Sequence, residues 1–270
     1  MEINATLVKE LREKTGVGLM ACKKALKETN GDIEESIKKL REKGLATASK
    51  KSDRTANEGR VFIATSPNSD KVVIVEVNCE TDFVASNDDF STFGNSIATH
   101  ILDNNIQDLA ALESSAVTGK NFPDYVSEYV LKLGEKLNIK QFKTQQAPFG
   151  HYIHMNHKIG IIVQFSNKVE EETAKSIAMH IAATNPKYIK SDEVPESELD
   201  AERQIIRTQA LNEGKPEKIL DKIVEGKLSK YYKEHCLLDQ AYIKDDKKSI
   251  REVLTDQTTV TEFIRYQIGE

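Results

Sequence analysis

Hydrophobic residues recur at helical spacing in three short runs between residues 4 and 44. Each run places apolar side chains three or four positions apart, so each predicts a helix with one face that packs against the others. Asp32 followed by Glu35 resembles a capping box at the start of the third run. The runs predict a compact module at residues 1–45, with apolar positions Leu7, Val8 and Leu11, then Leu19, Cys22, Ala25 and Leu26, then Ile33, Ile37 and Leu40.

The helical spacing is lost after this module, and residues 46–59 are rich in Ala, Ser, Lys and Thr. This composition predicts a partly helical linker to a second domain that begins near Arg60. The three-helix pattern has the architecture of a ubiquitin-associated domain. Such a module is typical of docking to another protein rather than of catalysis.

Apolar runs typical of strands begin after the linker. Residues 61–64 and 72–77 flank a turn at 67–70, which predicts a hairpin. Residues 152–154 and 159–163 predict a second strand pair. The chain therefore changes from helical to strand-containing structure at about residue 60.

The second part of the core repeats the first. The strand KVVIV at 71–75 is followed by the helical run SIATHI at 96–101, and the strand KIGII at 158–162 is followed by SIAMHI at 176–181. The copies are offset by 87 residues at the strand, from 71 to 158, and by 80 at the helix, from 96 to 176. We interpret the core as a duplicated sheet-plus-helix unit whose first copy holds seven extra residues between strand and helix.

Two further patterns complete the predicted fold. Helical runs on both sides of Gly214-Lys215-Pro216 predict a protruding antiparallel helical hairpin with spare apolar surface for a second copy of the chain. Alternation between Val260 and Ile268 predicts a last strand that returns to the core. The predicted class is α+β, with a three-helix ubiquitin-associated-like domain at 1–45, a linker at 46–59, core subdomains of duplicated antiparallel sheet plus helix at 60–147 and 148–191, a dimerisation hairpin at 192–232 and a C-terminal segment at 233–270.

Composition narrows the classes of function. The 270 residues carry a net charge of -5 with both signs mixed along the chain, so direct binding to nucleic acid is not expected. No apolar run approaches the roughly 18 residues that a membrane span needs. The three cysteines have no zinc-site or disulfide-framework spacing. We expect a helix-rich cytoplasmic protein that does not bind membranes.

Catalytic motifs give little support for an enzyme. The sequence has no Gly-rich phosphate loop, His-Glu-x-x-His motif or Gly-x-Ser-x-Gly motif. His151, His154 and His157 lie close together in the sequence and could suggest a metal site. One alternative function is therefore a metal-dependent or thiol enzyme that uses His151, His154 and Cys79. Positions three apart on a strand point to opposite faces, and no basic residue near Cys79 would lower its pKa. We expect no bound metal, no cofactor and no catalytic residues.

Asp82-Phe83 lies inside the extra segment of the first repeat. A large aromatic directly after a strand can fold back and cover the core. It can also protrude, and a Phe held by a rigid loop is the kind of anchor that dominates protein interfaces. The sequence pattern leaves both readings open.

The segment that contains Asp82-Phe83, EVNCETDFVA at 76–85, resembles a signature of the elongation factor Ts family. LREKTGVGLMACKKAL at 11–26 resembles a second signature of the same family. The similarity continues through short motifs to the C-terminal strand and covers essentially the whole chain; those motifs are HIAA at 180–183, NP at 185–186, GKP at 214–216, VEGK at 224–227 and FIR at 263–265.

The resemblance implies a guanine-nucleotide exchange factor that binds elongation factor Tu and releases its GDP. In the family, the Asp and Phe of the Thr-Asp-Phe-Val loop push into the nucleotide-binding domain and disturb the Mg²⁺ and phosphate site. The alternative is a ubiquitin-associated-type adaptor without exchange activity. The matched partner-binding positions are Thr81, Asp82, Phe83 and Val84 in the loop, Arg12 and Met20 in the three-helix module, and Leu133 and His154 in the core.

Overall fold

The structure, a computed structural model, describes residues 3–254 and 257–270. Two residues of the predicted 1–45 domain and two of the predicted 233–270 segment therefore lie outside the description. Helix makes up 52% and strand 22%, with antiparallel sheet and a helical N-terminal region, so the α+β prediction is confirmed. Contacts divide the chain into two units, described in turn below: residues 1–144, 155–159 and 266–270 form unit 1, and residues 145–154 and 160–265 form unit 2.

Unit 1 begins with three helices, α1 (Ala5–Thr15), α2 (Leu19–Glu28) and α3 (Ile33–Lys51). The side chain of Asp32 accepts a hydrogen bond from the Glu35 N–H and caps α3. α3 continues through Lys51, so its last turns occupy the start of the segment predicted as a linker. The helices enclose a small apolar core made of Val8, Leu11, Val17, Cys22, Ala25, Leu26 and Leu40.

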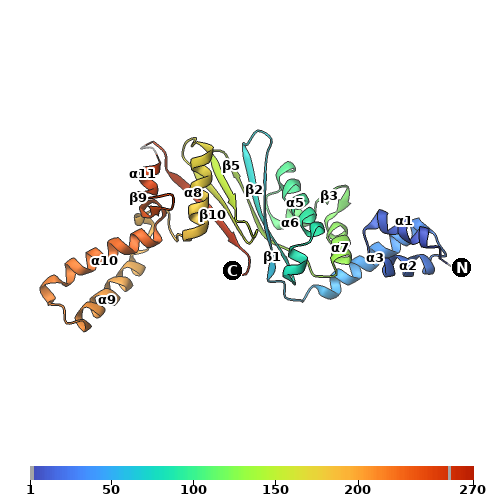
Figure 1. Ribbon diagram of the computed structural model, residues 1–270, viewed down its shortest axis with the longest axis horizontal. Helices are drawn as coiled ribbons and strands as arrows, with labels where there is room; N and C mark the ends of the chain where they lie inside the picture. The colour runs from blue at the N-terminus through green and yellow to red at the C-terminus, as the bar shows by residue number, and fades with distance from the viewer. Residues whose placement is uncertain (1–2, 255–256) are drawn as a thin grey trace. The chain divides into compact units, whose positions relative to one another are not determined.

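The first sheet has the order β1-β2-β5. β1 (Glu58–Thr65) and β2 (Lys71–Cys79) form the predicted antiparallel hairpin, and β5 (Asn138–Gln146) lies on the other side of β2. α5 (Asp88–Asp103) packs on β1 and β2 (Figure 1). The remaining elements of unit 1 are α4 (Asp82–Ala85), α6 (Leu109–Glu113), β3 (Ala116–Val117), β4 (Lys120–Asn121) and α7 (Phe122–Leu133).

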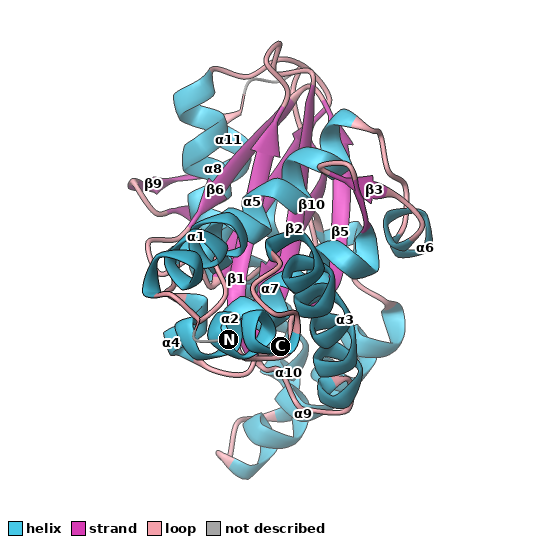
Figure 2. Cartoon of the chain, turned by 90° about the vertical axis from the view of Figure 1, so that its right-hand side faces the viewer, coloured by secondary structure: helices cyan, strands magenta, loops and turns pink. Residues whose placement is uncertain are grey.

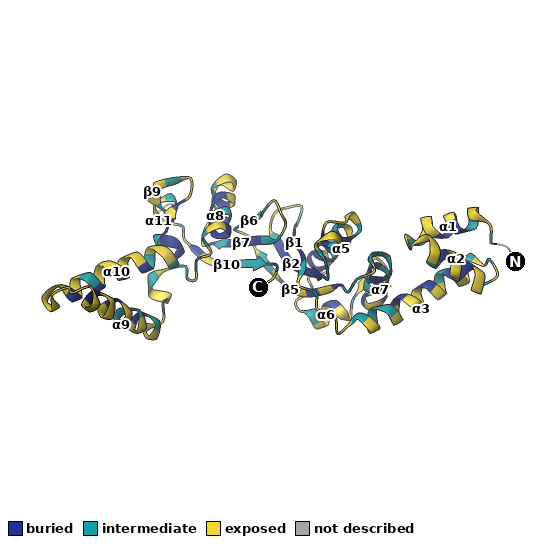
Figure 3. Ribbon diagram, turned by 60° about the horizontal axis from the view of Figure 1, so that its bottom comes forward, coloured by how far each residue is buried: buried dark blue, intermediate teal, exposed yellow. Residues whose placement is uncertain are grey.

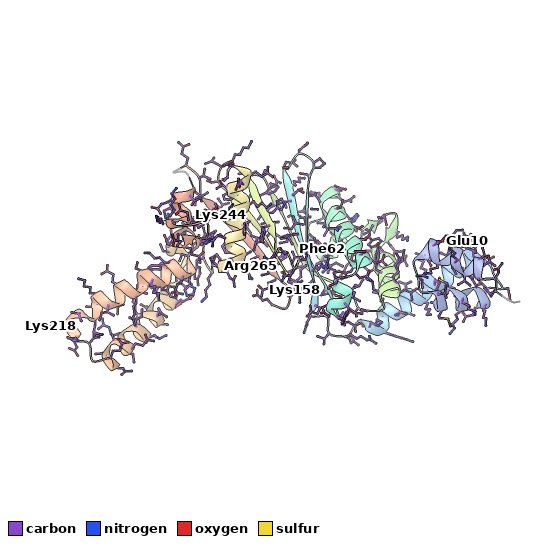
Figure 4. All side chains as sticks on the ribbon, in the orientation of Figure 1. Glu10, Phe62, Lys158, Lys218, Lys244 and Arg265 are labelled. Carbon is purple, nitrogen blue, oxygen red and sulfur yellow. The ribbon has the colours of Figure 1, made fainter. Side chains whose placement is uncertain are left out.

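Close packing of α5 on the sheet depends on Gly94. Phe62 of β1, labelled in Figure 4, lies against this helix, and its ring centroid is 6.0 Å from that of Phe90. A Cβ atom at Gly94 would lie 2.2 Å from the Phe62 ring. The absence of a side chain at this position lets the helix approach the sheet closely.

Unit 2 contains most of a sheet with the order β10-β7-β6. β6 (Phe149–Ile153) and β7 (Ile159–Phe165) form the second predicted antiparallel hairpin, and β10 (Val260–Gln267) confirms the predicted last strand. α8 (Glu171–Thr184) packs on β6. Figure 2 shows the strands of both sheets in magenta.

The two sheets share one connectivity. In each, the second strand of a hairpin is central and leads to a helix, and a later strand lies on its other side. The connection from β2 to α5 contains the short helix α4, whereas residues 166–170 between β7 and α8 form no helix. The segment that the repeat analysis identified as extra therefore contains α4.

The predicted helical hairpin consists of α9 (Glu196–Asn212) and α10 (Leu220–His235). The two helices bury a seam between them, and their outward faces are exposed in Figure 3. Within the described part of the chain, no helix has the length and apolar character needed to cross a bilayer. The other elements here are 3₁₀ turns at Ser191–Glu193, Glu217–Ile219 and Leu237–Asp239, β8 (Ala241–Tyr242), β9 (Asp245–Ser249) and α11 (Ile250–Val253).

Candidate partner-binding site

The short helix α4 presents Asp82 and Phe83 to solvent. Ala85 is buried and Val84 packs on the core of unit 1, so these two residues hold the helix against the sheet. Asp82 is exposed, and Phe83 is 84% exposed. The reading in which Phe83 folds back to cover the core is therefore wrong, and the protruding reading describes the chain.

Thr81 starts this helix. Its side-chain oxygen accepts a hydrogen bond from the Val84 N–H at 3.3 Å, which satisfies one of the free N–H groups of the first turn. Its extended backbone, with φ -130° and ψ 156°, turns the chain from the end of β2 into the helix. The four residues of the sequence motif therefore have separate structural roles: Thr81 caps, Val84 packs, and Asp82 and Phe83 protrude.

Cys79 lies just before this loop and is fully buried. Its thiol donates a hydrogen bond to the Thr81 carbonyl oxygen at 3.2 Å. Burial, together with the negative charge of Glu135, raises the pKa of Cys79 to about 12. A thiol in this state is a poor nucleophile, so Cys79 is a packing residue.

A carboxylate that the sequence analysis did not identify binds the base of the loop. Glu135 Oε2 accepts hydrogen bonds from the backbone N–H groups of Glu80 and Thr81, each at 3.0 Å, and Glu135 Oε1 accepts one from the Thr81 hydroxyl at 2.6 Å. In return, Glu80 Oε1 accepts a hydrogen bond from the Lys136 N–H at 2.7 Å. Four hydrogen bonds therefore join residues 80–81 to residues 135–136.

Leu133 lies next to this contact. It is the last residue of α7, and Gly134 ends the helix with a left-handed backbone at φ 76°. Leu133 is partly buried and packs on the same apolar cluster as Val84. The structure therefore brings the turn after Leu133 and the Thr81–Val84 loop together. The sequence analysis gave no signal for Glu135.

Arg12 and Met20 lie on the three-helix module, on different elements from α4. Arg12 is exposed in the last turn of α1. Met20 is 74% exposed in the first turn of α2, and its neighbour Leu19 is also exposed. Both predicted positions are accessible to a partner.

His154 belongs to unit 2 and is partly buried. Its Nδ1 atom lies 3.2 Å from the Tyr152 hydroxyl, at hydrogen-bonding distance. His151 contacts the ring of Phe149, and His157 occupies a turn with φ 56°. No group of three or more His, Cys, Asp or Glu side chains within residues 3–254 and 257–270 has an arrangement that would hold a metal ion.

A family model described as Elongation factor TS matches residues 80–270. The match includes the Thr81–Val84 loop, Leu133, Glu135 and His154.

Proposed function

The chain belongs to the elongation factor Ts family of translation elongation factors, and we propose that it binds elongation factor Tu and accelerates the release of GDP from it. The observation that best supports this proposal is the exposure of Phe83 on a helix that is held in place by Val84, Ala85 and the Thr81 cap. A large aromatic side chain in this position gains free energy when a partner buries it.

Exchange requires no covalent chemistry. A protein that binds nucleotide-free elongation factor Tu more tightly than the GDP-bound form must weaken GDP binding by the same factor, because the two affinities are linked. The chain would therefore act as a binding protein rather than an enzyme. We propose that it acts in the cytoplasm and uses no cofactor of its own.

Asp82 and Phe83 have distinct proposed roles. Phe83 enters the nucleotide-binding domain of elongation factor Tu and displaces the helices that support the Mg²⁺ and phosphate site. Asp82 fixes the direction of approach through its charge. Because Mg²⁺ is a large local charge in a nucleotide site, a small displacement of its supports has a large effect on GDP affinity.

The other matched residues provide docking contacts in this proposal. The exposed Arg12 and Met20 dock the three-helix module, and Leu133 and His154 contribute from the core. Thr81 and Val84 contribute by holding the shape of the loop. Docking at several places raises affinity and directs Phe83 to one position on the partner.

We also propose that the helical hairpin forms a homodimer. The seam between α9 and α10 buries Ile206, yet three large apolar residues of the hairpin remain exposed. Exposed apolar groups of this kind are expected at a subunit interface. The three residues are Ile205, Leu211 and Ile219.

Stopped-flow fluorescence tests the proposed exchange activity. Elongation factor Tu loaded with a fluorescent GDP analogue is mixed with excess unlabelled GDP, with and without this protein. We expect the analogue to leave faster as the protein concentration rises, towards a plateau. Binding without faster release would instead support the ubiquitin-associated-type adaptor and reject the exchange proposal.

A further inference from the structure

We propose that Glu135 is a positioning residue that holds the Thr81–Val84 loop in the shape that presents Phe83. This inference rests on the exchange function proposed above and adds a residue to it. Glu135 itself is not one of the exposed residues Asp82 and Phe83. It would act through the backbone that carries them.

The hydrogen bonds define what Glu135 holds. Its carboxylate accepts from two successive backbone N–H groups, those of Glu80 and Thr81, and from the Thr81 hydroxyl. These residues join β2 to α4, so their backbone direction sets the axis of the helix that bears Phe83. Hydrogen bonds to an ionised acceptor are about twice as strong as neutral ones, so removal of the carboxylate frees the start of α4.

The Thr81 hydroxyl connects this contact to the helix itself. The same oxygen that donates to Glu135 accepts from the Val84 N–H. The Glu135 carboxylate, the cap and the first turn of α4 therefore form one chain of hydrogen bonds. A loss at Glu135 would change the orientation of the cap as well as the backbone before it.

A second set of contacts attaches the Glu135 turn to the end of α3. The Lys51 ammonium donates to the Gly134 carbonyl oxygen at 2.6 Å and lies 3.9 Å from the Glu80 carboxylate. The Lys136 N–H and Arg54 hold the pKa of Glu80 below its usual value, so this carboxylate stays ionised at neutral pH. These contacts fix the turn that contains Glu135, so its carboxylate can hold Thr81 in one position.

Side-chain chemistry gives two variants with different expected effects. Glu135→Ala removes the acceptors of three hydrogen bonds. Glu135→Gln keeps one oxygen, which can accept both backbone N–H groups, and its amide can donate to the Thr81 hydroxyl oxygen because a hydroxyl both donates and accepts. Glu128→Ala is the matched control, since Glu128 is a carboxylate of α7, the helix that ends just before the turn containing Glu135, and it pairs with Lys120.

Stopped-flow measurement of GDP release from elongation factor Tu gives the functional test. We expect Glu135→Ala to lower the plateau rate of GDP release by about tenfold. Loss of a charged acceptor that several donors share would lower the fraction of molecules whose loop presents Phe83 correctly. Glu135→Gln should retain most of the rate, and Glu128→Ala should retain all of it. A plateau rate for Glu135→Ala within about twofold of wild type would overturn the proposal.

A double-mutant cycle separates positioning from general destabilisation. If Glu135 acts through Phe83, Glu135→Ala causes no further loss in a chain that already carries Phe83→Ala. An equal loss in both backgrounds would mean that Glu135 acts elsewhere, and would reject the positioning role.

Amide hydrogen exchange of the free protein tests the loop contact without the partner. We expect the amides of Thr81 and Val84 to exchange faster in Glu135→Ala than in wild type, with the strands of β1 and β2 unchanged. Unchanged protection at both amides would reject the proposed support. If the wild-type protein does not accelerate GDP release, the exchange function fails, while this measurement on the free protein still decides the role of Glu135.

Discussion

Replacement of Phe83 by Ala removes the side chain that protrudes most clearly from α4. Burial of a Phe side chain is worth about 1.5–3 kcal/mol. Because Phe83 is 84% exposed in the free chain, about 1.3–2.5 kcal/mol of this free energy remains available to a partner. At about 1.4 kcal/mol per factor of ten, loss of this whole free energy from the exchange reaction corresponds to a roughly 8- to 60-fold slower release of GDP from elongation factor Tu at subsaturating protein concentrations.

The assay is stopped-flow release of a fluorescent GDP analogue, with thermal unfolding of each variant measured in parallel. Phe83→Ala should leave the free energy of unfolding nearly unchanged, because an exposed side chain contributes little packing. Ile243→Ala is the control, since Ile243 is also an exposed apolar residue but lies outside the proposed contact positions. A release rate for Phe83→Ala equal to that of wild type would refute the role given to this side chain.

Three further predictions concern stability and assembly. The hydrogen bond from Arg41 holds the pKa of Asp124 below its usual value, so the ionised carboxylate stabilises the fold above the unfolded pKa of about 3.9, and this contribution is lost as pH falls from there through the lower folded pKa. Urea unfolding should therefore show Asp124→Asn less stable than wild type at neutral pH, with a stability difference that shrinks in acid; a difference that stays constant would contradict this. Gly94→Ala should destabilise the fold by about 1–3 kcal/mol in the same assay, because its new methyl group overlaps the Phe62 ring, and an unchanged midpoint would contradict the packing described. Leu211→Lys should convert a dimer into a folded monomer in sedimentation experiments at micromolar concentration, whereas a wild-type chain that sediments as a monomer would count against dimerisation through the hairpin.

The pattern of apolar residues was sufficient to predict several elements of the fold. The strand hairpins at 61–77 and 152–163, the last strand and the helical hairpin all appear in the structure. β5 was not predicted, because its sequence NIKQFKTQQ has few apolar residues and its strand conformation depends on pairing with β2. Helical spacing also did not decide which of the adjacent residues Ile205 and Ile206 is buried; only Ile206 enters the seam.

At the candidate site, too, part of the structure could not be predicted from the sequence. The sequence identified the residues of the loop but left the direction of Phe83 open, because that direction depends on the burial of Ala85 and on the packing of Val84 against the core. The contact between Glu135 and Thr81 joins residues 54 positions apart. Hydrogen bonds between such distant residues leave no periodic pattern in the sequence, so this support became visible only in three dimensions.

The affinity of elongation factor Tu for GDP, measured at equilibrium with and without a saturating amount of this protein, tests the central claim most directly. We predict that GDP binds more weakly when the protein is present, and that the protein binds the GDP form more weakly than the nucleotide-free form by the same factor. An unchanged GDP affinity at saturation would contradict the account.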